Sequence, residues 1–172
     1  KEVPLEGFGS FDIRFSDDHD AQQTTLVSPD LATCDDCLDE LFNPEDRRYR
    51  YPFINCTNCG PRFTIIGSLP YDRPATSMKD FPMCPRCAAP LDRRFHAQPD
   101  ACWDCGPHIS WVNLAQGQQE PQWGDTREAS DAIFAEAVKL LLDGGIVAVK
   151  GLGGFHLVCD ASNPDALAKL RQ

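Results

Sequence analysis

Eight of the nine cysteines stand in four C-x-x-C pairs, a spacing typical of metal binding. The pairs are Cys34/Cys37, Cys56/Cys59, Cys84/Cys87 and Cys102/Cys105. Two thiolates separated by two residues can reach one zinc ion from a tight turn, and two such turns complete a tetrahedral site. Four thiolates leave no open coordination position, so the sequence predicts two zinc ions with structural rather than catalytic roles. An iron–sulfur cluster could also use four thiolates, but zinc is the default metal.

The four pairs can share two metal ions in two ways. Sequential sharing places the first two pairs on one ion and the last two on the other. Interlaced sharing, with the outer pairs on one ion and the inner pairs on the other, is also geometrically possible. An internal repeat favours sequential sharing, because residues 43–49 match residues 89–95 and each copy leads into a C-x-x-C-Gly-Pro run.

The two copies differ in length before the second cysteine pair. Eighteen residues separate Cys37 from Cys56, whereas fourteen separate Cys87 from Cys102. Either the second copy has a shorter connection, or four residues are absent from this sequence. After the second cysteine pair of each copy we expect a strand, at 63–66 and at 109–112. Gly60 and Gly106 follow the last cysteine of each copy, where a positive φ would help backbone N–H groups to face the sulfurs.

Each copy also carries paired arginines beside an aromatic residue. These runs, 47–51 and 93–96, could hold a phosphate or the carboxylates of a partner. We favour a structural role, in which Asp46 and Asp92 pair locally with the arginines and the aromatic rings pack on the metal turns. His19, His96 and His108 are not needed as ligands.

Composition narrows the class of protein. The net charge of −10 argues against a nucleic-acid partner, because such proteins usually carry a basic surplus. No apolar run of about eighteen residues and no basic-then-apolar N-terminal signal is present, so we expect a soluble, cytoplasmic protein without a membrane partner. In a reducing compartment, paired cysteines indicate metal sites rather than disulfides.

The predicted fold class is α+β, a small duplicated zinc-finger module followed by the beginning of an α/β domain. We expect a connector over 1–27, tandem four-cysteine fingers over 28–112, a polar linker over 113–124, and the α/β segment over 125–172. The first helix should begin at Ser28-Pro29-Asp30 and end near Asn43. In the α/β segment we expect, in chain order, a helix capped at 125–126 and ended by 144–145, strands at 146–149 and 155–159, and a helix from 163.

A glycine-rich turn joins the two strands of the α/β segment. Such turns expose backbone N–H groups that can cradle a phosphate, with a lysine nearby for charge. The candidate binding residues are Lys150, Gly151, Gly153, Gly154 and His156. Tight turns alone explain many such runs, and the lone Cys159 is expected in a core.

Several runs resemble the HypF family, the carbamoyltransferases that mature NiFe hydrogenases. The spacing of the first three cysteine pairs is similar to that family, and so are the runs 47–57, 59–66, 71–74 and 92–99. Residues 150–157 are similar to the opening of the family's YrdC-like domain. The resemblance implies an acylphosphatase domain, two zinc fingers, a YrdC-like domain and a Kae1-like domain, in that order.

The resemblance also implies an activity. The family consumes carbamoyl phosphate and ATP, with magnesium, makes carbamoyl-adenylate, and passes the carbamoyl group to the C-terminal cysteine of the partner HypE; the group later becomes a cyanide ligand of the hydrogenase iron. Its other partners would be the remaining domains of its own parent chain. By this resemblance, Lys150 and the glycines after it would lie at or near the adenylate-forming pocket, and the catalytic residues stay unassigned.

The chain departs from the family in three respects. It carries no acylphosphatase motif, it ends early in the YrdC-like part, and its second finger is four residues short of the family spacing, which favours absent residues over a deletion. We therefore expect a piece of a larger enzyme that is inactive alone. The alternative is a free-standing zinc-ribbon interaction module, like the zinc domains of chaperones that hold a partner protein.

Overall fold

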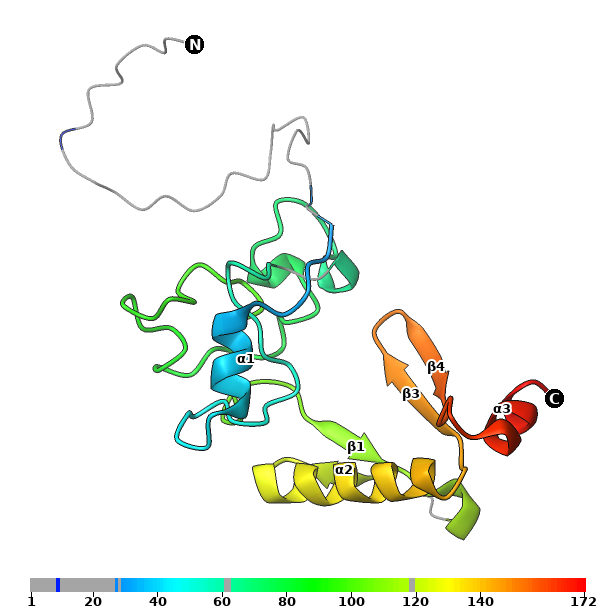
Figure 1. Ribbon diagram of the computed structural model, residues 1–172. Helices are drawn as coiled ribbons and strands as arrows, with labels where there is room; N and C mark the ends of the chain where they lie inside the picture. Colours follow the sequence, from blue (N-terminus) through cyan, green and yellow to red (C-terminus); the bar gives the residue numbers. More distant parts are fainter. Residues whose placement is uncertain (1–8, 10–26, 28, 61–62, 118–119) are drawn as a thin grey trace.

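The computed structural model describes residues 9, 27, 29–60, 63–117 and 120–172. A finger region comes first, with one short helix, α1 (Asp35–Phe42), and two 3-10 turns, η1 (Phe63–Ile65) and η2 (Arg73–Ala75). Helix α2 (Arg127–Leu142) then packs against a small hairpin, and a second hairpin and helix α3 (Pro164–Leu170) follow (Figure 1). The predicted α+β class is confirmed. The predicted connector, 1–27, lies outside the described residues except for Gly9 and Val27.

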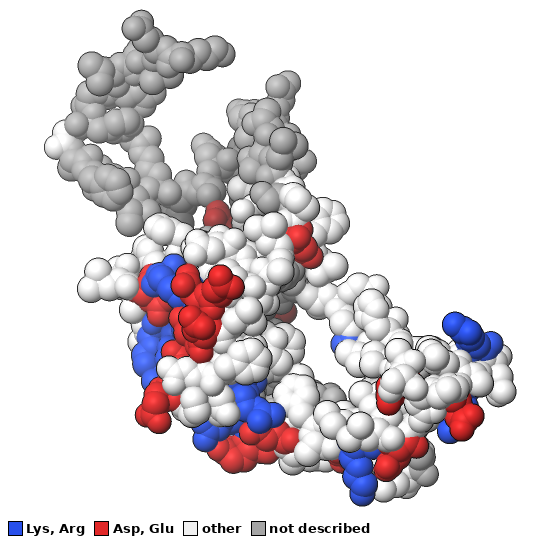
Figure 2. All heavy atoms as spheres, in the orientation of Figure 1, with Lys and Arg blue, Asp and Glu red and all other residues white. Residues whose placement is uncertain are grey.

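The surface of the finger region carries both signs of charge. On the face drawn in Figure 2, acidic and basic side chains lie next to one another over this region. Several charged side chains of the finger region form ion pairs, including Arg86 with Asp104 at 2.5 Å and Arg93 with Glu40 at 2.8 Å. None of the helices in the described part of the chain combines the length and apolarity needed to cross a bilayer.

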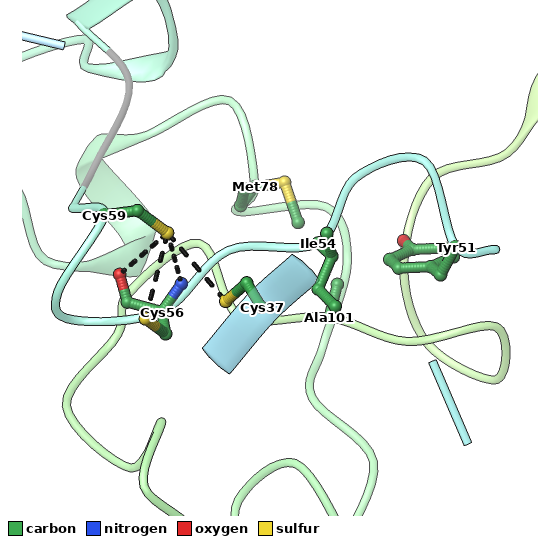
Figure 3. Packing of buried hydrophobic residues seen from close by; sticks show 7 residues of the cluster. All are labelled: Cys37, Tyr51, Ile54, Cys56, Cys59, Met78 and Ala101. Atoms are coloured by element: carbon green, nitrogen blue, oxygen red, sulfur yellow. Dashed lines mark hydrogen bonds between the residues drawn. The ribbon is translucent and has the colours of Figure 1, made fainter. Parts of the chain in front are cut away.

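Cysteines make up much of the core of the finger region. Its buried apolar cluster contains Cys37, Tyr51, Ile54, Cys56, Cys59, Met78 and Ala101 (Figure 3). Arg48, Arg94 and Asp100 are also buried, with exposed fractions of 3%, 1% and 0%. A core with so few apolar side chains and several buried charges cannot rest on the hydrophobic effect alone, which fits a fold that is held by metal.

Helix α1 begins later than the sequence predicted. Its N-cap is Cys34, in extended backbone, and the predicted start at Pro29 and Asp30 is wrong; Ser28 lies outside the described residues. The carboxylate of Asp30 instead accepts a hydrogen bond from the backbone N–H of Phe63 at 2.6 Å. This contact holds the 29–33 segment against the turn after the second cysteine pair. The predicted end is confirmed, since Asn43 is the C-cap.

The strand predicted after the second cysteine pair of each copy forms in only one of the two copies. Strand β1 (Ile109–Trp111) pairs antiparallel with β2 (Gln122–Gly124), as expected for the second copy. The strand predicted over 63–66 is wrong: residues 63–65 form η1, and Ile66 makes a single bridge to Thr76. A strand needs a partner of matching length, and β2 supplies one only to the second copy.

Residues 122–124, predicted as polar linker, form strand β2. The short turn η3 (Leu114–Gln116) lies between the strands of this hairpin. Gly124 allows α2 to approach closely, because a Cβ there would stand 2.6 Å from Ser130 Oγ, which itself donates to the Gly124 carbonyl at 3.0 Å. The hairpin is therefore packed to the helix that follows it.

The C-terminal helices begin at the predicted capping residues, and α2 ends at the predicted turn. Thr126 caps α2 by accepting from the N–H of Ala129, and Gly144, at φ 75°, follows its end. Strands β3 (Val147–Gly151) and β4 (Gly154–Val158) form an antiparallel hairpin. Asn163 caps α3 by accepting from two backbone N–H groups, and the helix ends at Leu170.

Candidate metal centres

The first two cysteine pairs converge on one point. The Sγ atoms of Cys34, Cys37, Cys56 and Cys59 all lie within 4.8 Å of one another. Three of their separations are 3.5 Å for Cys34–Cys56, 3.8 Å for Cys56–Cys59 and 3.9 Å for Cys59–Cys37. Helix α1 carries Cys37, and a turn closed by the hydrogen bond from Gly60 N–H to the Cys56 carbonyl carries the second pair.

The last two pairs repeat this arrangement. Cys84, Cys87, Cys102 and Cys105 also lie with their Sγ atoms within 4.8 Å of one another. Their separations are 3.8 Å for Cys84–Cys102 and for Cys102–Cys105, and 3.7 Å for Cys105–Cys87. The structure thus brings the eight cysteines together sequentially, not interlaced, and the shorter connection after Cys87 still allows the second cluster to close. We call the two sets cluster 1 and cluster 2.

Both clusters fit a single tetrahedral ion. With zinc–sulfur distances of about 2.3 Å, the sulfur–sulfur edges of a tetrahedron are about 3.8 Å. The separations given above, 3.5 to 3.9 Å in cluster 1 and 3.7 to 3.8 Å in cluster 2, lie close to this value. Sulfurs this far apart are not disulfides, whose S–S bond is about 2.05 Å, and the cysteines are free. Zinc held here would fix the geometry of four chain segments. With four sulfur ligands it keeps no position for a substrate.

Backbone N–H groups and burial act on the thiols in opposite directions. Burial raises the pKa of the Cys37 thiol to about 12. Burial opposes ionisation of Cys56 as well, but backbone N–H donors lower its pKa to about 6; one of them, Asn58 N–H, lies 3.3 Å from the sulfur. Zinc binds the thiolate form of cysteine, so metal binding would favour loss of the proton from the buried Cys37 thiol.

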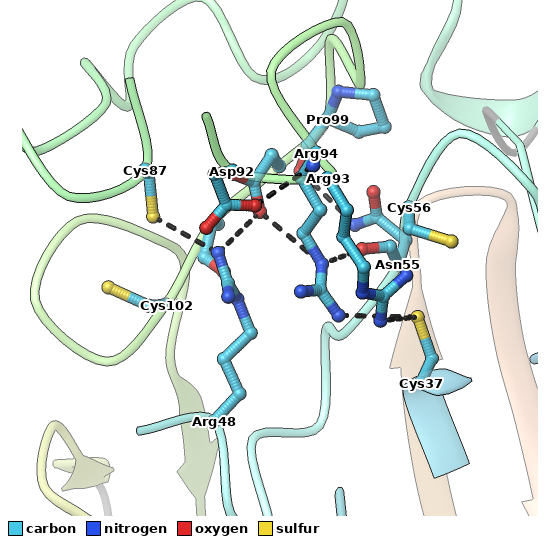
Figure 4. Close-up of polar contacts among 12 residues, drawn as sticks. Cys37, Arg48, Asn55, Cys56, Cys87, Asp92, Arg93, Arg94, Pro99 and Cys102 are labelled. Carbon is cyan, nitrogen blue, oxygen red and sulfur yellow. Dashed lines mark hydrogen bonds and ion pairs between the residues drawn. The ribbon is translucent and has the colours of Figure 1, made fainter. Parts of the chain in front are cut away.

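The paired arginines cross from one finger to the other. In the second finger, Arg93 and Arg94 each donate to Cys37 Sγ of cluster 1, at 3.4 and 3.3 Å (Figure 4). In the first finger, Arg47 donates to Cys87 Sγ of cluster 2 through both Nη atoms at 3.4 Å, and Arg48 through Nη2 at 3.4 Å. Each cluster therefore receives two guanidinium groups from the opposite finger.

The expectation of local pairing with aspartates is corrected by these contacts. Asp46 and Asp92 accept the backbone N–H of Arg48 and Arg94, at 2.7 and 2.9 Å, and so shape the turns of their own fingers rather than pair with the guanidinium groups of those fingers. The ion pair Arg47–Asp92, at 3.6 Å, joins the two fingers. The spacing of residues in the sequence gave no sign of this exchange, because it depends on how the two copies face each other.

Arg48 and Arg94 also donate hydrogen bonds to backbone carbonyl groups of the opposite finger. Arg48 Nε donates to the carbonyl of Ala101 at 3.0 Å, and Arg94 Nε donates to the carbonyl of Asn55 at 2.7 Å. Ala101 and Asn55 each precede the first cysteine of a C-x-x-C pair. The two fingers are thus related by an approximate twofold arrangement in which each positions the metal turn of the other.

The two glycines after the metal turns serve different purposes. Gly60 has φ 66°, as predicted. Gly106 does not have a positive φ, so that part of the prediction is wrong. Instead, a Cβ there would stand 1.9 Å from the Tyr51 hydroxyl, which donates to the Pro107 carbonyl at 3.2 Å. Gly106 therefore makes room for a buried tyrosine of the first finger.

The described histidines take no part in the clusters. His96 and His108 are described, and neither lies in either group of metal-ligating side chains. His108 stacks on Trp103 with ring centroids 6.2 Å apart. His19 lies outside the described residues.

The glycine-rich turn forms the tip of the β3–β4 hairpin. Gly151 pairs with Gly154 at the strand ends, and Leu152 and Gly153 make the turn. Lys150 pairs with Phe155, and its Nζ lies 5.9 Å from that ring. His156 pairs with Val149, so it lies on the opposite face of the hairpin from Lys150, because directly paired residues share a face. The binding role of these residues stays a prediction.

Comparison with known proteins assigns both parts of the chain. The HypF finger model matches residues 33–66 and 83–112. The telomere recombination model of the Sua5/YciO/YrdC family matches residues 139–172. The carbamoyltransferase HypF of Rhodobacter capsulatus is 55% identical over 151 residues, 86% of this chain, and HypF2 of Cupriavidus necator is 52% identical over 171 residues, 99% of this chain.

This chain belongs to the HypF family. Two crystal structures of HypF superpose on it, that of T. kodakarensis HypF with a TM-score of 0.71 and 51% identity over 85% of the chain, and full-length HypF in the phosphate- and nucleotide-bound form with 0.65 and 50% over 84%. The chain spans 19% and 20% of the two HypF relatives and 18% of each crystallised chain. Its matched region is the HypF finger module and the start of a YrdC-like segment.

Proposed function

We propose that this chain is the zinc-finger region and the first YrdC-like elements of a HypF carbamoyltransferase. The parent enzyme would use carbamoyl phosphate and Mg-ATP to form carbamoyl-adenylate, and would transfer the carbamoyl group to the C-terminal cysteine of HypE. That group would then become a cyanide ligand of a NiFe hydrogenase. The supporting observation is an identity of about half the residues to HypF carbamoyltransferases, which covers both the fingers and the YrdC-like segment.

In this proposal the fingers set geometry and do not take part in the reaction. Both clusters present four sulfurs, so zinc bound there keeps no site for carbamoyl phosphate or ATP. The adenylate pocket would instead form around the hairpin tip, with Lys150 and the glycines Gly151, Gly153 and Gly154 beside the phosphates. Support comes from the exposure of residues 151–153 in that turn and from the lysine one position before it.

The exposed apolar side chains of the hairpin fit a segment that other parts of the parent enzyme would cover. Leu152, Phe155 and Leu157 are 65%, 69% and 61% exposed. Side chains of this size are normally packed, which fits a hairpin that further parts of the parent enzyme cover. The proposed partners are the remaining domains of the parent chain and a HypE-type protein, in the cytoplasm, with neither nucleic acid nor membrane involved.

Exchange of labelled pyrophosphate into ATP tests the proposal. Adenylate formation breaks the α–β phosphoanhydride of ATP and releases pyrophosphate, so the exchange reports that step. The complete parent protein should exchange only when carbamoyl phosphate is present, and should add one carbamoyl group to the C-terminal cysteine of HypE. The present chain alone should be inactive. Exchange by the chain alone, or its absence in the parent protein, would contradict the proposal; the second result would favour a zinc-ribbon interaction module.

A matched pair of lysine variants locates the pocket. In the parent protein, Lys150→Ala should reduce exchange at least about tenfold, because a cation that stabilises transferring phosphates is lost. Lys139→Ala, on the exposed side of α2, should leave the rate unchanged. Equal rates for the two variants would remove the hairpin tip from the proposed pocket.

A further inference from the structure

The crossed arginines make each cluster depend on a finger that contributes none of its ligands. A zinc ion with four thiolates carries a net charge of −2, and the two arginines that face each cluster can balance that charge. For cluster 1 both arginines come from the second finger, and for cluster 2 both come from the first.

We propose that the two metal centres bind zinc cooperatively, and that Arg48, Asp100 and Arg94 carry the coupling between them. The three residues are positioning residues, because they act on the metals through the thiolates of Cys87 and Cys37. Filling one cluster raises the affinity of the other, and by thermodynamic reciprocity the effect is equal in both directions.

A continuous line of polar contacts joins the clusters. Arg48 Nη2 lies 3.4 Å from Cys87 Sγ and 2.9 Å from Asp100 Oδ1. The same carboxylate oxygen lies 3.9 Å from Arg94 Nε, and Arg94 Nη2 lies 3.3 Å from Cys37 Sγ. Asp100 thus stands between two guanidinium groups, each of which ends on a different cluster.

Burial makes this line sensitive to the state of each metal. The exposed fractions of Arg48, Arg94 and Asp100 are at most 3%, so water cannot replace a lost partner. If cluster 2 lost its zinc, the Cys87 sulfur would no longer be fixed beside Arg48, and the buried guanidinium would lose one of its partners. A buried charge that loses a partner is costly, and the nearest relief is a shift of the Asp100 carboxylate, which Arg94 also faces.

The chain connections add a second route between the clusters. Arg93 and Arg94 lie in the connection between Cys87 and Cys102, which contains turns but no helix or strand. The ligands at its two ends fix this connection only when cluster 2 holds its metal. Zinc loss there would therefore release the two arginines that face Cys37, and the mirror argument applies to Arg47 and Arg48 of the first finger.

Single-site chains test the coupling directly. Cys34→Ser removes cluster 1 and Cys84→Ser removes cluster 2, and neither cysteine is among those that accept from an arginine in the contacts above. Competition with a zinc chelator on the complete chain should show the remaining cluster binding zinc at least about tenfold more weakly than it does in the unaltered chain. Unchanged affinity of the remaining cluster would overturn the proposal.

Arginine variants then show whether each cluster depends on the arginines of the opposite finger. In the Cys84→Ser chain, which keeps only cluster 1, Arg94→Gln should weaken zinc binding further, and Arg48→Gln should do less. In the Cys34→Ser chain the order should reverse. Arg86→Gln is the matched control: this arginine lies next to Cys87 in the sequence, is 64% exposed and pairs with Asp104. An arginine that acts only on its own finger would give the opposite order and would overturn the crossed arrangement.

A milder variant keeps the test decisive if a single-site chain does not fold. At one equivalent of zinc, native mass spectrometry should find the unaltered chain mainly with no zinc or with two, and Asp100→Asn should increase the one-zinc form. Asparagine keeps the size of the side chain but removes the charge that both arginines face. With cobalt in place of zinc, the thiolate-to-metal absorption band should also shift in Arg94→Gln and not in Arg86→Gln. A one-zinc fraction that is the same in the unaltered and Asp100→Asn chains would overturn the proposal.

Discussion

The two fingers share a motif, but the paired arginines of each finger form ion pairs with different carboxylates. Arg93 and Arg94 of the second finger pair with Glu40 on α1, a residue of the first finger that precedes the repeat. Arg48 of the first finger pairs with Asp100, which occupies the position of Ile54 in the repeat. The second finger has no counterpart of Glu40, because the four residues missing after Cys87 correspond to that part of α1.

This difference shows what the repeat conserves and what it leaves free. Both copies keep four sulfurs at tetrahedral spacing and two arginines aimed at the other cluster. The carboxylates that pair with these arginines come from different segments in the two copies. The metal geometry is therefore symmetric, whereas the buried charge network around it is not.

Removal of both metals should have the largest effect. Structural zinc in small fingers contributes about 10–16 kcal/mol of apparent binding free energy, and the finger core contains few apolar side chains besides cysteine. Chelation should therefore unfold residues 29–112, while α2 keeps its amide protection. Hydrogen exchange followed by mass spectrometry measures both parts in one sample. Retained protection in the fingers after complete zinc removal would contradict a metal-held fold.

The next largest effect should come from alanine at the two turn glycines, and its size should differ between the two fingers. A Cβ at Gly106 would overlap Tyr51 and Ala101, so Gly106→Ala should cost about 3 kcal/mol of unfolding free energy. A Cβ at Gly60 meets nothing within 4 Å, and Gly60→Ala should cost only the left-handed backbone penalty of about 1 kcal/mol. Urea unfolding of the zinc-loaded chains tests the order, and equal costs would refute the packing role of Gly106.

The Glu40 carboxylate should matter more for cluster 1 than for cluster 2. Glu40→Gln should lower the stability of the first finger by about 2 kcal/mol, because two charge-assisted hydrogen bonds lose their charge. Burial would raise the pKa of Glu40, but Arg94 and Arg93 hold it below its ordinary value. The contribution is therefore present at neutral pH and is lost as the pH falls through that depressed pKa.

Zinc release from each cluster and urea unfolding at several pH values measure this contribution. The difference between Glu40→Gln and the unaltered chain should vanish in acid. A difference that grows as the pH falls would contradict the assignment of the lowered pKa to the two arginines.

The exposed pairs at the metal turns should have the smallest effect. Asp36 accepts from Asn58 at 3.5 Å in the first finger, and Arg86 with Asp104 occupies the same positions in the second. Both pairs are exposed and screened by solvent, so Asp36→Ala and Arg86→Ala should each change the stability little. Thermal unfolding should show almost overlapping curves, and a large loss in either variant would mean that these pairs support the clusters.

The sequence predicted features that depend on local spacing. Two cysteines at a C-x-x-C spacing lie on one turn, and the caps Thr126 and Asn163 act within three residues of themselves. These features appeared as expected, and so did the hairpin around the glycine-rich turn.

Features that depend on how distant segments meet were not predictable in this way. The arginines look equivalent in the two copies, and only their arrangement in space shows that each reaches the other cluster. Residues 63–66 have the composition of a strand but lack the partner that β1 finds in β2. Gly106 was assigned to a positive φ, whereas the reason for the glycine is the hydroxyl of Tyr51 from the other finger.

X-ray absorption at the zinc edge, combined with metal determination on the complete chain, tests the central claim most directly. Two separate four-thiolate centres predict two zinc ions per chain, each surrounded by four sulfurs at about 2.3 Å, with no nitrogen or oxygen ligand. A single metal per chain, or a first shell that mixes sulfur with nitrogen or oxygen, would contradict the two-cluster account.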